Sequence, residues 1–235
     1  MSQTAFSQTI QVDVWSDVAC PWCYVGKRKL ELGIQQFEAA NPQTNIDVVF
    51  HSFQLDPNIP TDYEGSHQQY LVENKGFPAE QIGVMHDRLA GIGAAVGLSY
   101  NFDQVQTTNT QLAHELMQFA KTLGKQIELK ERIMNAYFSL GQHVGKVDVL
   151  VALAGQVGID ESAARRVLEE RTYRNAFEAD VAQAREFGIS GVPFFVIQNK
   201  YGIEGAQGPE MFVHAFETVQ AELADTSLGQ NQGEV

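Results

Sequence analysis

Two cysteines stand three residues apart in the segment Cys20-Pro21-Trp22-Cys23, and the chain has no others. If a helix begins here, positions i and i+3 share a face, which brings the two sulfurs within disulfide range. Unpaired N–H groups and the positive end of the helix dipole favour the thiolate, which is the attacking species. We therefore expect Cys20 to be the exposed, acidic nucleophile and Cys23 to resolve the mixed disulfide. Pro21 suits the first helical position, where a missing N–H costs nothing.

Other interpretations of the cysteine pair are weaker. A zinc or iron site needs about two further ligands, and the six histidines include no pair spaced like zinc ligands, so no metal is expected. Buried inert cysteines and a purely structural disulfide both remain open, although the latter is rare in a reducing compartment. The basic run at 27–29 reads as a solvated helix face.

A second motif lies far along the chain, at Val192-Pro193. An ordinary trans proline at a strand entrance explains it, because proline cannot donate to a sheet ladder. The alternative is a cis Val192-Pro193 bond in a tight turn beside the cysteines. Such a turn would leave the backbone of Val192 free to pair with an extended substrate.

Hydrophobic periodicity predicts the elements that position these motifs. The expected order is a β-α-β unit, an all-helical block, and an α-β-β-α unit. The predicted elements are strand 10–15, helix 24–38, strand 46–53, helices starting at Pro78 and Asn109, helices 128–140, 148–156, 160–170 and 172–187, strands 192–197 and 201–203, and a helix from Pro209.

This order predicts an α/β fold in which a helical insertion interrupts one α/β layer, because neither flanking half can bury a sheet alone. The domain boundaries follow from the change in period. We expect the first half of the α/β domain over 1–58, the helical insertion over 59–171, the second half over 172–225, and a flexible tail over 226–235.

The motifs together resemble the thioredoxin-like superfamily, and within it the DsbA family. The sequence segments around the two motifs resemble its FrnE-like branch, which is related to 2-hydroxychromene-2-carboxylate isomerases and kappa-class glutathione transferases. The resemblance spans about residues 10–223 and rests on the segments 16–26 (SDVACPWCYVG), 109–110 with 113–114, 188–196 (GISGVPFFV), and 205–207 with 209–210.

The resemblance implies a thioredoxin-like fold with a helical insertion, a reactive Cys20, and a cis Pro193 facing the disulfide. It also implies a substrate groove between the insertion and the thioredoxin part. Besides Pro21, Trp22, Val192 and Pro193, the residues expected to line that groove are Asn109 and His114, although Asn109 equally suits a helix N-cap and His114 a satisfied buried side chain.

Two departures from the family pattern bear on function. DsbA proteins often carry histidine where this chain has Trp22, so a strongly oxidising centre is not expected. The isomerase and transferase relatives tend to carry serine at the first cysteine position, whereas both thiols remain here. Thioredoxins also bury an acid before the motif, and Asp13 and Asp17 are the candidates for it.

We therefore predict a dithiol–disulfide oxidoreductase. The alternatives are a glutathione-dependent isomerase or transferase of small aromatic compounds, and a non-catalytic docking module. No bound cofactor is expected, although glutathione could serve as co-substrate. The expected partners are disulfide-containing proteins or low-molecular-weight thiols.

Composition narrows the partners further. The formal net charge of the 235-residue chain is −13, which repels phosphate backbones and anionic membranes. No signal sequence and no long apolar run is evident, which predicts a cytoplasmic protein. The oligomeric state is not predicted.

Overall fold

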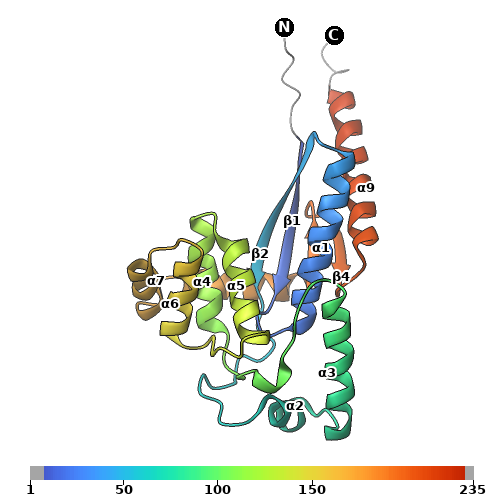
Figure 1. Ribbon diagram of the computed structural model, residues 1–235. Coiled ribbons are helices and arrows are strands. Elements are labelled where there is room, and N and C mark those ends of the chain that lie inside the picture. The colour runs from blue at the N-terminus through green and yellow to red at the C-terminus, as the bar shows by residue number, and fades with distance from the viewer. Residues whose placement is uncertain (1–7, 231–235) are drawn as a thin grey trace.

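The computed structural model describes residues 8–230 and contains a four-stranded sheet in the order β2-β1-β3-β4 (Figure 1). The strands are β1 (Gln8–Ser16), β2 (Thr44–Ser52), β3 (Phe194–Ile197) and β4 (Tyr201–Glu204). β1 pairs with β2 in parallel and with β3 antiparallel, and β4 pairs antiparallel with β3. Strands from both ends of the chain thus form one sheet, which confirms the predicted α/β fold.

The predicted helices are all present in the predicted order, with small shifts at their ends, and one further helix and one 3-10 turn were not predicted. They are α1 (Pro21–Ala40), α2 (His67–Lys75), α3 (Ala79–Ala94), the 3-10 turn η1 (Phe102–Gln104), α4 (Gln111–Thr122), α5 (Gln126–Phe138), α6 (Val147–Gln156), α7 (Glu161–Glu169), α8 (Arg174–Glu186) and α9 (Pro209–Gln230). Within the described part of the chain, no strand lies between β2 and β3.

Side-chain alternation along β1 assigns the two faces of the sheet to different helices. Val12 and Val14 point toward the core shared with α1 and α9, where Phe37, Phe212 and Phe216 are buried. Trp15 points to the opposite face and packs among residues of α8 and the segment that follows it. This period of two is what a strand covered on both faces requires.

The helical insertion lies at the end of β1 where α1 begins. Figure 1 shows α4 to α7 beside the sheet and α2 and α3 beyond the start of α1. The first turn of α1, with Cys20 and Cys23, shares one hydrophobic core with α4, α5 and α6. The cysteines are therefore held between the thioredoxin-like part and the insertion.

One helix and one helix end differ from the prediction. α2 has only two buried residues, Tyr70 and Leu71, which are adjacent and give no helical period. Its start was nevertheless encoded by a capping box, in which Ser66 and Gln69 exchange side-chain-to-backbone hydrogen bonds. At the other end, α9 continues to Gln230, so it enters the segment expected to be a flexible tail. Residues 231–235 lie outside the described residues.

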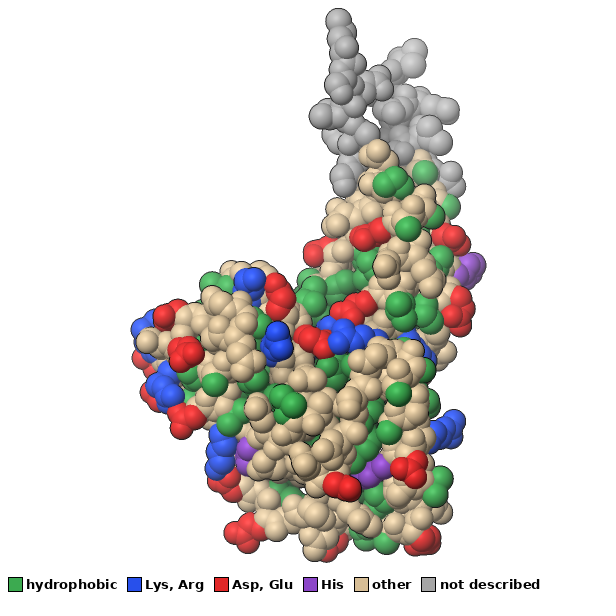
Figure 2. Space-filling view, viewed as in Figure 1, with side chains coloured by type: hydrophobic (Ala, Val, Ile, Leu, Met, Phe, Trp, Pro, Cys, Tyr) green, Lys and Arg blue, Asp and Glu red, His purple; other side chains and the backbone are tan. Residues whose placement is uncertain are grey.

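Two of the three predicted domain boundaries fall in connections between elements, whereas the third, at 225, lies within α9. Position 58 lies between β2 and α2, and position 171 lies between α7 and α8. No helix within residues 8–230 is both long and apolar enough to cross a membrane. On the face shown in Figure 2, acidic and basic side chains are interspersed, and no continuous basic area is visible.

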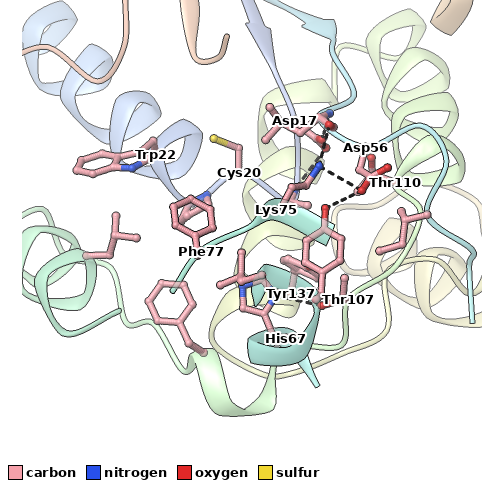
Figure 3. Close-up of a pocket in the computed structure, with 18 of the residues that line it drawn as sticks. Asp17, Cys20, Trp22, Asp56, His67, Lys75, Phe77, Thr107, Thr110 and Tyr137 are labelled. Carbon is pink, nitrogen blue, oxygen red and sulfur yellow. Dashed lines mark hydrogen bonds and ion pairs between the residues drawn. The ribbon is translucent and has the colours of Figure 1, made fainter. Parts of the chain in front are cut away.

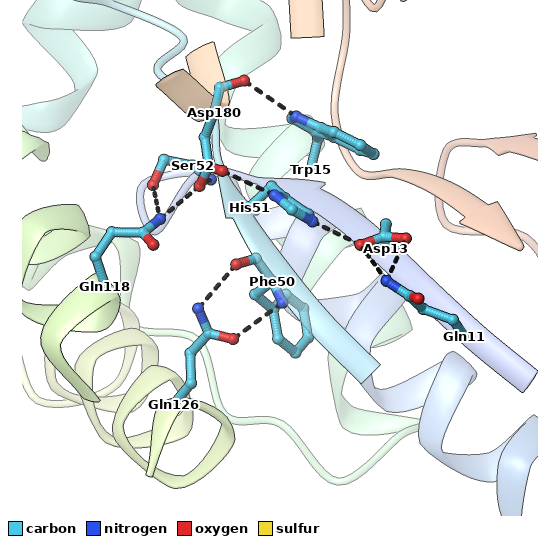
Figure 4. A network of polar contacts seen from close by, with 9 residues as sticks. All are labelled: Gln11, Asp13, Trp15, Phe50, His51, Ser52, Gln118, Gln126 and Asp180. Atoms are coloured by element: carbon cyan, nitrogen blue, oxygen red, sulfur yellow. Dashed lines mark hydrogen bonds and ion pairs between the residues drawn. The ribbon is translucent and has the colours of Figure 1, made fainter. Parts of the chain in front are cut away.

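A buried polar network connects the sheet to α8 and to the insertion (Figure 4). The His51 ring on β2 bridges Asp13 Oδ1 on β1 at 2.7 Å and Asp180 Oδ1 on α8 at 2.8 Å. Trp15 stacks on the His51 ring with centroids 4.5 Å apart, and Gln118 of α4 donates to Asp180 Oδ2 at 2.5 Å. The network therefore holds four elements from distant parts of the chain together.

The network predicts a pH-dependent contribution of His51 to stability. Burial lowers the pKa of His51, but its hydrogen bonds to Asp13 and Asp180 outweigh burial and raise that pKa overall. A raised pKa in the folded state stabilises the fold fully below the unfolded pKa of about 6.5, and this contribution is lost as pH rises through the folded value. The loss of unfolding free energy in His51→Asn is therefore largest at acidic pH and shrinks at alkaline pH.

Urea unfolding of both proteins at several pH values between 5.5 and 9 measures this difference. His214→Asn, at an exposed position of α9, is the control and leaves the pH dependence unchanged. A constant loss in His51→Asn across this range would contradict the expectation.

Candidate active site

The two cysteines occupy the start of α1 as the sequence predicts. Cys20 is the N-cap residue with an extended backbone, Pro21 is the first helical residue, and Cys23 lies in the first turn. The backbone N–H of Cys23 donates to Cys20 Sγ at 3.3 Å. Both cysteines are free thiols here. The first sulfur thus receives one of the N–H groups that a helix start leaves unpaired.

The segment before β3 brings the second motif against the first. The Cys20 thiol donates to the carbonyl oxygen of Val192 at 3.6 Å. The Val192–Pro193 peptide bond is cis, as the family resemblance implies. Pro193 lies against α1 at Gly26, where the prolyl ring fills the space that a side chain would need.

This close approach makes Gly26 a sensitive position. A Cβ atom at Gly26 would lie 2.8 Å from Pro193 Cγ and 3.2 Å from Phe195 Cζ. We expect Gly26→Ala to destabilise the protein by about 1–3 kcal/mol through overpacking. The matched control is Gly83→Ala in α3, where a Cβ meets nothing within 4 Å. That control should gain roughly 0.5–1 kcal/mol, because alanine favours a helix interior.

Thermal and urea unfolding of the two alanine variants test this pair of expectations. Equal behaviour of the two variants would show that Pro193 does not constrain α1.

Burial changes the expected electrostatics of Cys20. Its side chain is 3% exposed and that of Cys23 is 1% exposed, so neither sulfur stands free on the surface. The neighbouring Cys23 thiol, burial, and the Asp17 carboxylate raise the pKa of Cys20 well above its usual value, although the Cys23 N–H acts in the opposite direction. The prediction of an exposed, acidic Cys20 is therefore wrong for the dithiol form, because the helix start is enclosed by the insertion.

Asp17 is the buried acid beside the cysteines. It lies at the end of β1 and contacts His114 Nε2 at 3.2 Å, and it accepts hydrogen bonds from the backbone N–H groups of Ala19 and Leu55. Burial raises the pKa of Asp17, but these hydrogen bonds and the His114 ring lower it overall. Asp13, the other candidate, belongs instead to the His51 network on the opposite face of the sheet.

A cavity of about 410 Å³ opens next to Cys20 (Figure 3). Its walls come from the start of α1, the loop after β2, α2, α3, the 3-10 turn, α5 and the Gly191–Val192 segment. Pro21 and the 39% exposed Trp22 line it, together with Val192, as the sequence predicts. Pro193 does not line it, contrary to expectation, because its ring packs against Gly26 of α1. The cavity lies between the insertion and the thioredoxin-like part, where the groove was expected.

Asn109 and His114 do not line this cavity, contrary to expectation. The Asn109 side chain holds the loop after β2, donating to the carbonyls of Pro57 and Ile59, and accepts from the backbone N–H of Gln111 near the start of α4. The His114 ring is fully buried behind Asp17. Both residues therefore lie outside the cavity wall. Neither has the structural role weighed against groove lining, because Thr110 is the N-cap residue of α4 and His114 Nδ1 has no hydrogen-bond partner among the described residues.

Much of the cavity wall was missed by sequence reasoning. The additional lining residues include Asp56, His67, Tyr70, Lys75, Phe77, His86, Phe102 and Tyr137. Several belong to α2, which the periodicity did not predict. The Ser66–Gln69 capping box is the one local signal that would have placed α2.

Two lysines are also buried. Lys27, expected on a solvated face, is 3% exposed and contacts Glu31 at 2.5 Å and Glu131 at 2.7 Å. Lys130 of α5 is fully buried, and within the described part of the chain its Nζ has no hydrogen-bond partner and lies 4.7 Å from the Phe50 ring centroid. Burial lowers the pKa of Lys130 to about 8, although Cys23 and Asp17 act to raise it.

Comparison with known proteins is consistent with this geometry. Residues 11–217 match the family model described as DSBA-like thioredoxin domain. The uncharacterised Bacillus subtilis protein YwbO is 31% identical over 218 residues, which cover 90% of this chain and 98% of YwbO.

Solved structures share the same fold. A probable DsbA oxidoreductase of Streptomyces coelicolor is 33% identical, with a TM-score of 0.84 and 91% of each chain covered. The cytosolic disulfide reductase DsbM of Pseudomonas aeruginosa, solved with GSH, is 16% identical, with a TM-score of 0.63 over 90% of this chain and 99% of its own.

Proposed function

Since this chain belongs to the family of DSBA-like thioredoxin domains, we propose that it is a thiol–disulfide oxidoreductase acting through Cys20 and Cys23. The observation that carries the proposal is the placement of Cys20. Its sulfur accepts the Cys23 N–H, faces the Val192 carbonyl and borders the cavity. A disulfide entering the cavity would therefore meet the first sulfur, with the second one helical turn behind it.

The proposed reaction proceeds by two exchanges. The Cys20 thiolate attacks one sulfur of the substrate disulfide, forming a mixed disulfide and releasing the first substrate thiol, which takes up a proton. Cys23, as thiolate, then attacks Cys20 Sγ, forms the Cys20–Cys23 disulfide and releases the second substrate thiol. The substrate gains two electrons and the protein loses two, so an external dithiol must restore the reduced protein.

The environment of Cys20 favours reduction of substrates over their oxidation. DsbA is a strong oxidant because its reduced form is stabilised. The raised pKa of Cys20 means that the thiolate of the reduced form is not stabilised in this way here. We expect a Cys20–Cys23 potential closer to about −270 mV, as in thioredoxin, than to about −120 mV, as in DsbA. We place this work in the cytoplasm, where such a potential suits a reductase.

Redox titration against dithiothreitol, read by mass spectrometry of alkylated protein, tests this proposal. It should show two electrons exchanged and no intermediate at equilibrium. Cys23→Ser should accumulate a mixed disulfide with the substrate, because the resolving sulfur is gone. Retention of full turnover by Cys23→Ser would favour the isomerase or transferase alternative, and absence of any Cys20 adduct would overturn the oxidoreductase.

A further inference from the structure

The cavity beside Cys20 has a size and composition that restrict its ligand. Its volume of about 410 Å³ lies within the range of pockets that bind small molecules, roughly 300–1,000 Å³. Resting on the oxidoreductase function proposed above, we infer that this cavity binds an uncharged, aromatic disulfide or thiol of low molecular weight, in preference to glutathione.

Aromatic rings form one wall of the cavity. The His86 ring stacks on Phe102 with centroids 4.1 Å apart, and His67 stacks on His86 with centroids 5.7 Å apart. The planes of these rings lie within 14° of one another, so the three rings stack on one another as one aromatic cluster. An aromatic ligand that packs against this cluster gains buried area and ring–ring contacts.

The histidines of this wall are uncharged at neutral pH. Burial, with a smaller contribution from His86, lowers the pKa of His67 to about 4. Burial also lowers the pKa of His86, although Asp103 and Asp87 oppose it. The wall therefore offers neutral imidazole rings, which stack like other aromatic groups and do not attract anions.

The charged groups around the cavity disfavour a carboxylate ligand. Asp17 and Asp56 both line it, and Lys75 is the one lysine or arginine among the described lining residues. Lys75 Nζ already contacts Asp56 at 3.2 Å and the Leu55 carbonyl at 3.3 Å (Figure 3). Each half of oxidised glutathione carries two carboxylates, which would meet two acidic side chains and a lysine that is already paired.

Two buried polar atoms belong to residues that line the cavity and lack a hydrogen-bond partner among the described residues. His86 Nε2 and Thr110 Oγ1 are buried, and neither has a hydrogen-bond partner within the described residues. Both residues line the cavity. Because buried polar atoms are nearly always paired, a ligand that shifts either side chain toward the cavity would gain a hydrogen bond from a hydroxyl or ring nitrogen. The wall therefore favours an aromatic ligand and accommodates a neutral hydrogen-bonding group.

Single-turnover kinetics with the reduced protein test the ligand class. The probes are 4,4′-dithiodipyridine, which is uncharged, 5,5′-dithiobis(2-nitrobenzoate), which is aromatic and dianionic, and oxidised glutathione. Each rate is divided by the rate of the same probe with free dithiothreitol, which removes differences in intrinsic reactivity. We expect this normalised rate to be at least tenfold higher for dithiodipyridine than for either anionic probe.

Variants of cavity residues test ligand preference while both cysteines remain in place. Phe102→Ala should reduce the preference for dithiodipyridine severalfold, because it removes the ring behind His86. The matched control is Phe187→Ala, an exposed aromatic position that does not line the cavity, and it should leave the preference unchanged. Lys75→Met, which frees Asp56, should lower the normalised rate with oxidised glutathione further.

The outcomes distinguish this inference from the proposed function. The double variant Cys20→Ser, Cys23→Ser has no thiol left to react and should still bind dithiodipyridine in equilibrium dialysis, so a failure of the redox chemistry alone leaves the ligand class measurable. Equal normalised rates for the three probes, or a preference that survives Phe102→Ala, would overturn the inference while leaving the oxidoreductase intact.

Discussion

Replacing Cys20 with serine will lower the rate of disulfide reduction by roughly a thousandfold or more, which is the scale of losing an enzyme's nucleophile. The hydroxyl occupies the same N-cap position and can accept the Cys23 N–H, so the start of α1 is retained. A hydroxyl does not attack a disulfide sulfur at neutral pH, so the chemistry is lost without loss of the fold.

The rate is measured by reduction of insulin or of a small disulfide with dithiothreitol as reductant. Cys23→Ser is the matched control, since it keeps the nucleophile and should retain the first exchange as a single burst. Comparable turnover by Cys20→Ser and wild-type protein would exclude the mechanism.

Replacing Lys130 with methionine will stabilise the protein by about 3 kcal/mol at pH 7. The pKa of Lys130 is lowered from 10.5 to about 8, mainly by burial, and one pKa unit corresponds to about 1.4 kcal/mol. A buried ammonium without a hydrogen-bond partner is costly, and an apolar chain of similar length removes that cost. Below pH 8 the folded state carries the full penalty.

The pH dependence identifies the cause of this gain. Between pH 8 and 10.5 the folded protein loses the Lys130 proton while the unfolded chain keeps it, so wild-type stability rises relative to Lys130→Met. Unfolding in urea at pH 7 and pH 10 should therefore show a smaller difference at the higher value. Lys121→Met, at an exposed position of α4, is the control and should change stability by less than about 0.5 kcal/mol. A less stable Lys130→Met would show that the ammonium has a stabilising partner.

The features predicted from the sequence are those that local patterns specify. The Cys20-Pro21-Trp22-Cys23 motif has the composition of a helix start, and the structure places Cys20 at the N-cap. The 3.6-residue period in α5 reflects burial of one face, which includes Leu129, Ile133 and Ala136. α2 lacks such a face, because its buried residues Tyr70 and Leu71 are neighbours in sequence.

The place of the cavity was expected from the family resemblance, but most of its lining residues could not be predicted, because they come from segments without a common motif. His67, Phe102 and Tyr137 come from α2, the 3-10 turn and α5, and only their tertiary packing brings them together. The raised pKa of Cys20 has the same origin, since the enclosing insertion is encoded far from the helix start. Lys130 also appears polar in the sequence, and it is buried because other elements cover its face of α5.

The contact between Cys20 and Val192 has a consequence for synthesis of the protein. The two residues are 172 positions apart. A ribosome that adds roughly 5–20 residues per second therefore incorporates Val192 about ten to thirty seconds after Cys20. Until then the nascent chain presents both thiols without the carbonyl that will face them and without β3 to complete the sheet. During this interval both cysteines have been synthesised, but the segment that will pack against them has not.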